Sequence, residues 1–157
     1  MVNRDVIMGR LVEIDVCLAR LEKFKPFLWE EFAAEPDNFA IAEHYLRRAL
    51  EAVLDVGRHI LAKERLGKPR DYRAIIEMLG EKGVLPADFA SEFKRVAGYR
   101  NRLVHLYHEV TPREIYEIIQ HRLDDLYRYC GCILDYLEKT ENAQNAGNMP
   151  GKENAPG

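Results

Sequence analysis

Apolar side chains recur every three or four residues through most of this 157-residue chain, which is the period of an amphipathic α-helix. The strongest example lies between Asn38 and Leu66, where two apolar stripes run side by side. One stripe contains Ile41, Tyr45, Ala49, Ala52, Val53, Val56 and Ile60, and the second contains Leu46, Leu50, Leu54 and Leu61. No segment shows the two-residue alternation of a half-buried β-strand. The sequence therefore predicts an all-α protein built as a helical bundle.

Helix start and stop signals divide the chain into four to five helices. The first helix begins at residue 6 and stops before residue 26, and a short aromatic-rich turn or helix follows at 27–34. A long helix is expected from about 38 to 66, followed by one over 71–78. The next helix starts at 86 and includes residues 99–107, and the last one runs from 112 to 137. Asp37 or Asn38 can cap the long helix, and Asp71 can cap the next one. The last helix has the clearest signal, because Thr111 is an expected N-cap and Glu114 closes a capping box.

Length and composition fit a single domain followed by a tail. A chain of 157 residues with 47% hydrophobic content is long enough to bury one sizeable core. We expect this domain to span residues 1–139. After Thr140 the chain consists mainly of Asn, Ala, Gly, Pro and Glu, without aromatic or β-branched residues. That composition predicts a disordered tail over residues 140–157.

The compartment can also be inferred from the sequence. The first residues begin a charged helical pattern without the apolar core of a secretory signal, and no run approaches the roughly 20 apolar residues of a membrane span. We therefore expect a cytoplasmic protein with no membrane association. The three cysteines, Cys17, Cys130 and Cys132, are odd in number and lack metal-binding spacing, which predicts reduced thiols.

Charge is distributed unevenly along the chain. Residues 1–43 contain five Lys or Arg and nine Asp or Glu, whereas residues 44–73 contain eight Lys or Arg and four Asp or Glu. A phosphate backbone would prefer the surface of the second segment. The alternative interpretation is an ordinary solvated helix surface.

The residues that point to chemistry lie between 99 and 107, in the string YRNRLVHLY. Arg100 is a permanent cation whose planar fork of donors suits phosphate, and His105 can move protons near neutral pH. Asn101 adds an amide next to the arginine. Together these side chains suit attack by an RNA 2′-hydroxyl on its own phosphate. Because the nucleophile belongs to the substrate, we expect no metal and no other cofactor.

A helical wheel separates the residues of this motif. Phe93, Val96, Leu103, Val104 and Tyr107 form an apolar side of the helix, whereas Asn101, His105 and His108 form another side. Arg100 lies about 140° from His105 on the same wheel. The two side chains can bind one phosphate from opposite sides. Alternatively, each can lie close to the same motif of a second subunit across a two-fold axis.

The spacing of Arg100, His105 and Tyr107 resembles the Arg-x4-His-x-Tyr signature of HEPN-domain proteins. Within that superfamily the chain is most similar to the HepT toxins of minimal-nucleotidyltransferase toxin-antitoxin pairs. The apolar helical segment 45–60 and the helix start at 111–114 also fit that layout, so the resemblance covers roughly residues 1–138. It implies a HEPN-type helical bundle, a homodimer, and a toxin ribonuclease of a type VII (HEPN/MNT) system. It also implies an MNT-type nucleotidyltransferase antitoxin that modifies Tyr107 with AMP.

This resemblance and the residue chemistry give a hypothetical mechanism for RNA cleavage. His105 would act as the general base for the 2′-hydroxyl or as the acid for the leaving 5′-oxygen. Arg100 would stabilise the charge on the phosphorane, and Asn101 would orient the phosphate or the imidazole. One histidine does not easily serve as both acid and base in one turnover, which favours a homodimer with two motifs in one cleft. The second apolar stripe of the helix at 38–66 also predicts a partner subunit.

Alternative interpretations remain open at this stage. Arg100 and His105 can be purely structural, Tyr107 can be a core phenol, and His105 with His108 can form a metal pair, although no third ligand is evident. At the level of function, the first alternative is a non-catalytic HEPN binding module that partners a nucleotidyltransferase. The second is a helical scaffold without either activity.

Overall fold

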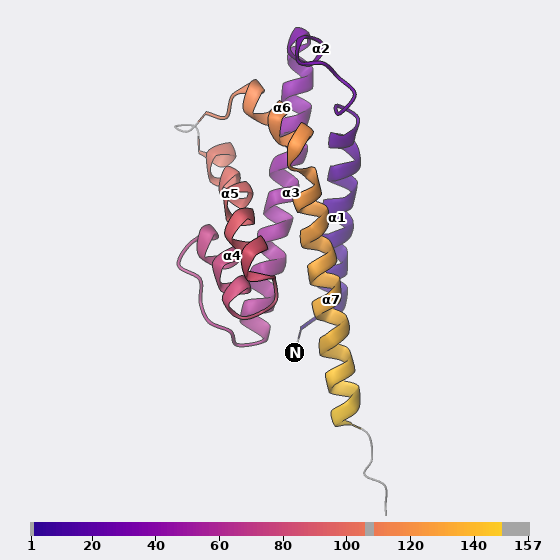
Figure 1. Cartoon of the computed structure of the whole chain (residues 1–157), viewed down its shortest axis with the longest axis vertical. Helices are drawn as coiled ribbons and strands as arrows, with labels where there is room; N and C mark the ends of the chain where they lie inside the picture. The colour runs from indigo at the N-terminus through magenta and orange to yellow at the C-terminus, as the bar shows by residue number, and fades with distance from the viewer. Residues whose placement is uncertain (1, 106–108, 149–157) are drawn as a thin grey trace, which may run out of the picture.

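The computed structural model describes residues 2–105 and 109–148, and these residues form seven α-helices and no β-strand (Figure 1). The helices are α1 (Arg4–Glu22), α2 (Trp29–Ala34), α3 (Pro36–Lys63), α4 (Tyr72–Glu81), α5 (Ala87–Val104), α6 (Pro112–His121) and α7 (Leu123–Gly147). The all-α bundle predicted from the sequence is confirmed. The described residues contain more helices than the expected four to five, because the aromatic segment forms α2 and the last predicted helix is divided into α6 and α7.

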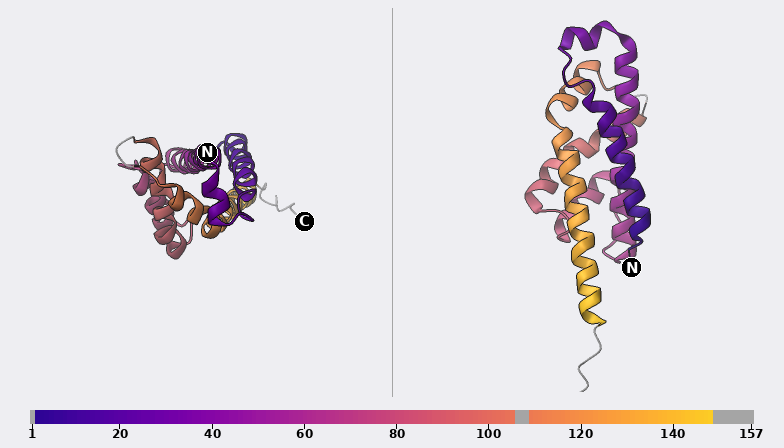
Figure 2. Two further views of the ribbon diagram at one scale, coloured as in Figure 1. Left: turned by 90° about the horizontal axis from the view of Figure 1, so that it is seen from above. Right: turned by 90° about the vertical axis from the view of Figure 1, so that its right-hand side faces the viewer.

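The long helix α3 lies at the centre of the bundle. It packs against α1 on one side and against α4 and α5 on the other, while α7 runs beside α1 (Figures 1 and 2). Helices of the same chain therefore cover most of both apolar stripes of α3, although Ile41 near the start of the helix is 45% exposed. Leu46, Leu50 and Leu54 of one stripe are fully buried, and so are Val53 and Ile60 of the other. The expectation that one stripe faces a partner subunit is wrong.

The ends of α3 differ in detail from those expected. The side chain of Glu35, and not that of Asp37 or Asn38, caps the helix by accepting a hydrogen bond of 3.3 Å from the N–H of Asp37. Helix α3 ends at Lys63, before the predicted residue 66, because Arg65 adopts a left-handed conformation with φ of 53°. That turn brings the N–H of Leu66 to the carbonyl of Leu61 at 2.9 Å and closes the helix end.

Two N-caps predicted from the sequence are confirmed. Asp71 accepts a 2.8 Å hydrogen bond from the N–H of Ala74 at the start of α4. Thr111 and Glu114 form the capping box of α6, with the N–H of Glu114 donating to the Thr111 hydroxyl oxygen at 3.2 Å. Helix α4 continues to Glu81, beyond the predicted end at Met78.

The last predicted helix is interrupted at Arg122, whose φ of −124° and ψ of −3° lie outside the helical range. A new helix, α7, begins at the next residue and continues past the predicted domain boundary at residue 139 to Gly147. Thr140 donates a 2.8 Å hydrogen bond to the carbonyl of Tyr136, and Arg4 pairs with Glu141 at 2.6 Å. The boundary at 139 is therefore placed too early. Residues 149–157 of the predicted tail lie outside the described residues.

A buried tyrosine links α7 to the centre of the bundle. Tyr129 donates a 2.7 Å hydrogen bond to the carbonyl of Val53, and its ring stacks on Phe93 with 5.2 Å between centroids. Burial raises the pKa of the Tyr129 phenol well above its ordinary value, so the hydroxyl stays a donor. In the part of the chain that the structure describes, no helix is long and apolar enough to cross a membrane.

The crossing of α3 and α4 predicts a measurable difference between two glycine substitutions. A Cβ atom on Gly57 would lie 2.5 Å from Cγ2 of Ile75 and 3.1 Å from Cδ1 of Leu79, whereas one on Gly9 of α1 would meet nothing within 4 Å. We expect Gly57→Ala to lower the free energy of unfolding by about 1–3 kcal/mol because of overpacking. Gly9→Ala should raise it by about 0.5–1 kcal/mol through helix propensity. Urea denaturation of the two variants measures both effects, and equal stabilities would contradict the close packing at Gly57.

Candidate functional site

The motif lies where α5 ends. Helix α5 stops at Val104, and His105 has extended backbone angles (φ −92°, ψ 117°) while its N–H still donates to the carbonyl of Asn101 at 3.0 Å. The expectation that this helix continues through residue 107 is therefore wrong. Tyr107 and His108 lie outside the described residues, so the AMP site stays a prediction and the alternative of a metal pair stays untested.

A network centred on Arg102 explains why α5 ends there. The guanidinium group donates to both carboxylate oxygens of Glu114, at 2.5 and 2.9 Å, and to the carbonyl of Glu109 at 3.0 Å. In a continuous helix, residue 109 would lie about 10 Å further along the axis than residue 102. The contact with Glu109 therefore requires the chain to turn back toward α5.

The same network joins the end of α5 to the start of α6. The hydrogen bond from Arg102 and those from Thr111 hold the pKa of the Glu114 carboxyl below its ordinary value. A carboxyl with a lowered pKa stabilises the fold at all pH values above its ordinary pKa, and this contribution is lost as the pH falls through the lowered value. The position of the motif segment is thus tied to an ionised Glu114.

Arg100 projects from α5 toward α4. Its guanidinium carbon lies 4.0 Å from the centre of the Tyr72 ring, a cation–π contact, and its Nη1 atom donates to the amide oxygen of Asn101 at 3.4 Å. The Nε atom of Arg100 is buried and has no hydrogen-bond partner within residues 2–105 and 109–148. Arg58 of α3 approaches the Tyr72 ring at 5.6 Å. Two arginines therefore share one tyrosine.

The helical wheel places Arg100 about 140° from His105, and the structure shows that Arg100 lies on the buried side of α5. Arg100 lies two helical turns after the fully buried Phe93, so it continues the buried stripe at the point where the core ends. Arg100 as a whole is half-buried.

His105 lies on a different side of the helix end. It is exposed and lines a cavity of about 410 Å³ together with Phe39 and Glu43 of α3 and the segment from Glu109 to Pro112. Among the residues with described positions, Arg100 and His105 make no contact. The helical wheel likewise predicts that the two side chains do not meet within one chain, and Asn101 contacts the arginine.

The basic segment at residues 44–73 is partly neutralised by the acidic N-terminal segment. Because α1 packs along α3, Arg48 pairs with Glu13 at 3.2 Å. Arg58 pairs with Asp55 at 2.5 Å, and Arg10 of α1 lies 3.6 Å from the same carboxylate. In the folded protein the difference in charge between the two segments is therefore smaller than it is along the sequence. Arg58 does lie beside the Tyr72 ring that contacts Arg100.

Sequence reasoning missed three side chains of this site. Tyr72 follows the cap of α4 without any pattern that connects it to Arg100. Glu43 occupies a helical position that looks like ordinary surface, and Arg102 looks like a solvated charge. A sequence signal exists only for the partner of Arg102, because Glu114 belongs to the predicted capping box.

Known proteins resemble this chain in sequence and in fold. A family model described as Ribonuclease HepT-like matches residues 14–133. The tRNA nuclease HepT of Aphanizomenon flos-aquae is 31% identical over 133 residues, which covers 84% of this chain and 90% of the relative. The mRNA nuclease HepT of Shewanella oneidensis is 24% identical over 132 residues, which covers 82% and 96%. A solved structure of a tri-AMPylated Shewanella oneidensis HEPN toxin in complex with MNT antitoxin has a TM-score of 0.77 at 23% identity, covers 85% of this chain and 99% of that chain, and is similar in fold.

Proposed function

Because this chain belongs to the HepT-like ribonuclease family, we propose that it is the endoribonuclease toxin of a type VII (HEPN/MNT) toxin-antitoxin system. The family match and the two curated nucleases support RNA as the substrate class. The observation that supports the activity best is Arg100, a half-buried cation with an unpartnered Nε donor, five residues before an exposed His105.

The cleavage step follows from these two side chains. His105 accepts the proton of the RNA 2′-hydroxyl, the 2′-oxygen forms a bond to phosphorus, and the bond from phosphorus to the 5′-oxygen breaks. A second proton goes to the leaving 5′-oxygen, so the products carry a 2′,3′-cyclic phosphate and a 5′-hydroxyl. Arg100 stabilises the added negative charge on the phosphorane through its guanidinium group, whose Nε donor has no hydrogen-bond partner among the described residues.

Tyr72 and Asn101 support the arginine in this mechanism. The Tyr72 ring lies under the guanidinium plane at 4.0 Å, and the Asn101 amide accepts from Nη1. Stacking fixes the plane of the donors and leaves their edge free for phosphate. Asn101 thus acts on the phosphate through Arg100.

We also propose that an MNT-type nucleotidyltransferase antitoxin controls the toxin. Such a protein is in complex with the HEPN toxin in the similar Shewanella oneidensis structure, and that toxin is described as tri-AMPylated. In this chain the corresponding modification site would be Tyr107 of the motif. Its hydroxyl oxygen would bond to the α-phosphate of ATP, with release of pyrophosphate and of the phenolic proton.

The third part of the proposal is a homodimer with the motif near its two-fold axis. The second stripe of α3 no longer supports it, but two observations do: His105 is the one motif imidazole within the described residues, and Val104 beside it is 38% exposed. A dimer supplies a second imidazole as the acid, and isologous dimers are the commonest oligomers. Light scattering at micromolar concentration should give twice the chain mass of 18.2 kDa. A monodisperse monomer would reject the dimer.

The proposed activity predicts a distinct pattern of substrates and products. The purified protein should cleave RNA, leave 2′,3′-cyclic phosphate ends, and spare DNA of the same sequence, which lacks the nucleophile. EDTA should not change the rate, because the attacking oxygen belongs to the substrate and no metal is needed to generate it. Mass spectrometry of the product ends and a gel assay with and without EDTA measure these outcomes. Cleavage that disappears with EDTA and returns with a divalent ion would overturn the mechanism.

A further inference from the structure

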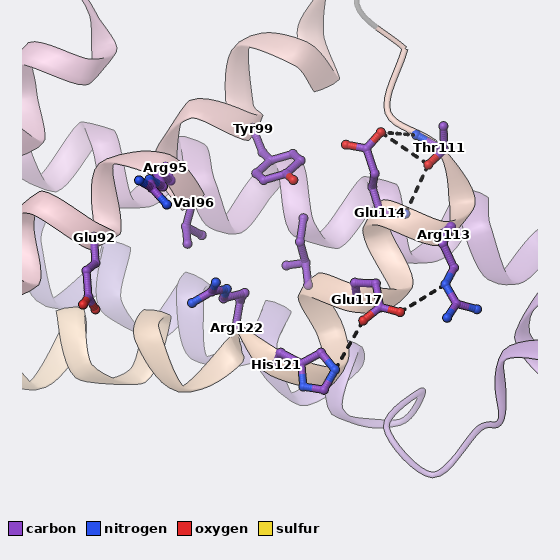
Figure 3. Close-up of a pocket in the computed structure, with 11 residues that line it drawn as sticks. Glu92, Arg95, Val96, Tyr99, Thr111, Arg113, Glu114, Glu117, His121 and Arg122 are labelled. Carbon is purple, nitrogen blue, oxygen red and sulfur yellow. Dashed lines mark hydrogen bonds and ion pairs between the residues drawn. The ribbon is translucent and has the colours of Figure 1, made fainter.

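A cavity of about 700 Å³ lies beside the motif, between α5, α6 and the start of α7 (Figure 3). This volume is within the range of sites that bind small organic groups. Val96 and Ile118 give the cavity an apolar surface, and both are almost fully buried. The half-buried ring of Tyr99, the residue just before Arg100, forms part of the wall.

Some charged side chains around this cavity are paired with opposite charges, and others are not. Glu117 is paired with Arg113 at 3.0 Å and with His121 at 3.3 Å, and Glu114 is held by Arg102. These ion pairs neutralise two of the carboxylates that line the cavity.

Two arginines of the same cavity have weak partners or none. Arg95 has no ion pair or hydrogen bond within the part of the chain that the structure describes, and the ion pair that Arg122 makes there is with Asp125, at 3.8 Å. Both arginines lie at the end of the cavity that also holds Glu92 (Figure 3). Because Arg95 has no ion pair among the described residues and Arg122 is held only at 3.8 Å, both guanidinium groups can turn toward an anionic group at this end.

Tyr99 offers a surface for a planar group. The guanidinium carbon of Arg102 lies 5.4 Å from the centre of its ring, and the cavity lies against the same side chain (Figure 3). Nucleobases stack on aromatic rings and on arginine planes in proteins that bind single-stranded RNA. A ring next to an anion-favouring end matches the two parts of a nucleotide.

The cavity lies next to the one that contains His105. Thr111 lines both this cavity and the one that contains His105, and Tyr99 precedes Arg100 directly. A strand whose scissile phosphate lies between Arg100 and His105 can therefore place a neighbouring nucleotide in the cavity.

We propose that this cavity is a subsite for a nucleotide next to the scissile step, with its base on Tyr99 and its phosphate between Arg95 and Arg122. The inference rests on the proposed ribonuclease function and adds to it a reason for the enzyme to prefer longer strands. A dinucleotide fills only the two positions that flank the cleaved bond, so it does not reach this subsite.

The test compares a mixed-sequence 12-mer RNA with dinucleoside phosphates. We expect Tyr99→Leu and the double variant Arg95→Ala/Arg122→Ala each to reduce, about tenfold, the ratio of kcat/KM for the 12-mer to kcat/KM for the dinucleotide. Tyr99→Trp should restore the ratio, since it keeps an aromatic face. The double variant should also bind a 2′-O-methyl 12-mer with a weaker salt dependence, because two phosphate contacts are lost. Arg20→Ala/Lys23→Ala removes the same charge from a distant exposed surface and serves as the control.

Several outcomes would overturn the subsite. If the wild type cleaves RNA and the ratio stays constant, the cavity does not hold a nucleotide. An equal loss on both substrates would indicate damage to the cleavage site. Variants that retain their affinity for the 2′-O-methyl 12-mer but lose the nucleotidyltransferase complex would assign the cavity to a protein partner. A wild type that neither cleaves nor binds RNA would instead reject the proposed function and the subsite together.

Discussion

Replacing Arg100 or His105 with alanine is expected to reduce RNA cleavage by about a hundredfold or more in each case. In the proposed mechanism the arginine stabilises charge that appears in the transition state, and the imidazole moves the proton that starts the reaction. Because both effects act on the transition state, kcat should fall more than KM rises. Initial rates on the 12-mer RNA, with circular dichroism to verify folding, measure the losses.

Matched controls separate chemistry from general damage. Arg20→Ala and His44→Ala remove the same residue types from exposed positions on α1 and α3, and both should retain cleavage within about twofold. Arg100→Lys keeps the charge but not the planar fork, so we expect it to recover only part of the activity. Cleavage that survives His105→Ala would remove the imidazole from the mechanism. Growth arrest on expression, abolished by the same substitution, would test the toxin activity in cells.

The second large effect concerns Tyr107. Incubation with a partner nucleotidyltransferase and ATP should add one or more adenylate masses per chain, with an adduct at Tyr107, and should lower cleavage at least tenfold. The added phosphodiester repels the RNA backbone and competes for Arg100. Tyr107→Phe removes the acceptor oxygen but keeps the ring, so we expect it to retain most cleavage and to escape this inhibition. Peptide mass spectrometry and the cleavage assay measure the two consequences.

The experiment with the phenylalanine variant discriminates between control by modification and control by binding. If the nucleotidyltransferase silences Tyr107→Phe equally well without ATP, complex formation alone is sufficient. An adduct found only on other tyrosines, such as the half-buried Tyr116, would return Tyr107 to the role of a core phenol. Either result contradicts the prediction.

Local signals predicted the local parts of the fold correctly. Asp71 and Thr111 cap helices as expected, because capping depends on residues within one turn. The end of α5 could not be predicted in this way, because it depends on the contacts of Arg102 with Glu109 and Glu114 across a turn of the chain. The division between α6 and α7 at Arg122 has no Gly or Pro signal at all.

In the candidate site, too, only residues that are close to one another in the sequence could be predicted. Spacing identified Arg100, Asn101 and His105, since these residues are neighbours in the sequence. It could not identify Tyr72 or Glu43, which approach the motif only because α4 and α3 pack beside α5. The two stripes of α3 predicted two contacts correctly, but periodicity alone does not distinguish another helix of the same chain from a second subunit.

The surroundings of Arg100 affect how this protein can change by mutation during evolution. Among the described residues its Nε is a buried donor without a partner, and Arg100 continues an apolar stripe, so we expect a long apolar side chain at this position to make the fold more stable. A single substitution to methionine or leucine would then abolish activity while leaving the bundle intact or firmer, which is the usual trade-off between stability and activity. If the proposed function holds, one substitution would therefore separate toxicity from folding, and a lineage could lose the ribonuclease activity while keeping a folded protein that still binds the antitoxin.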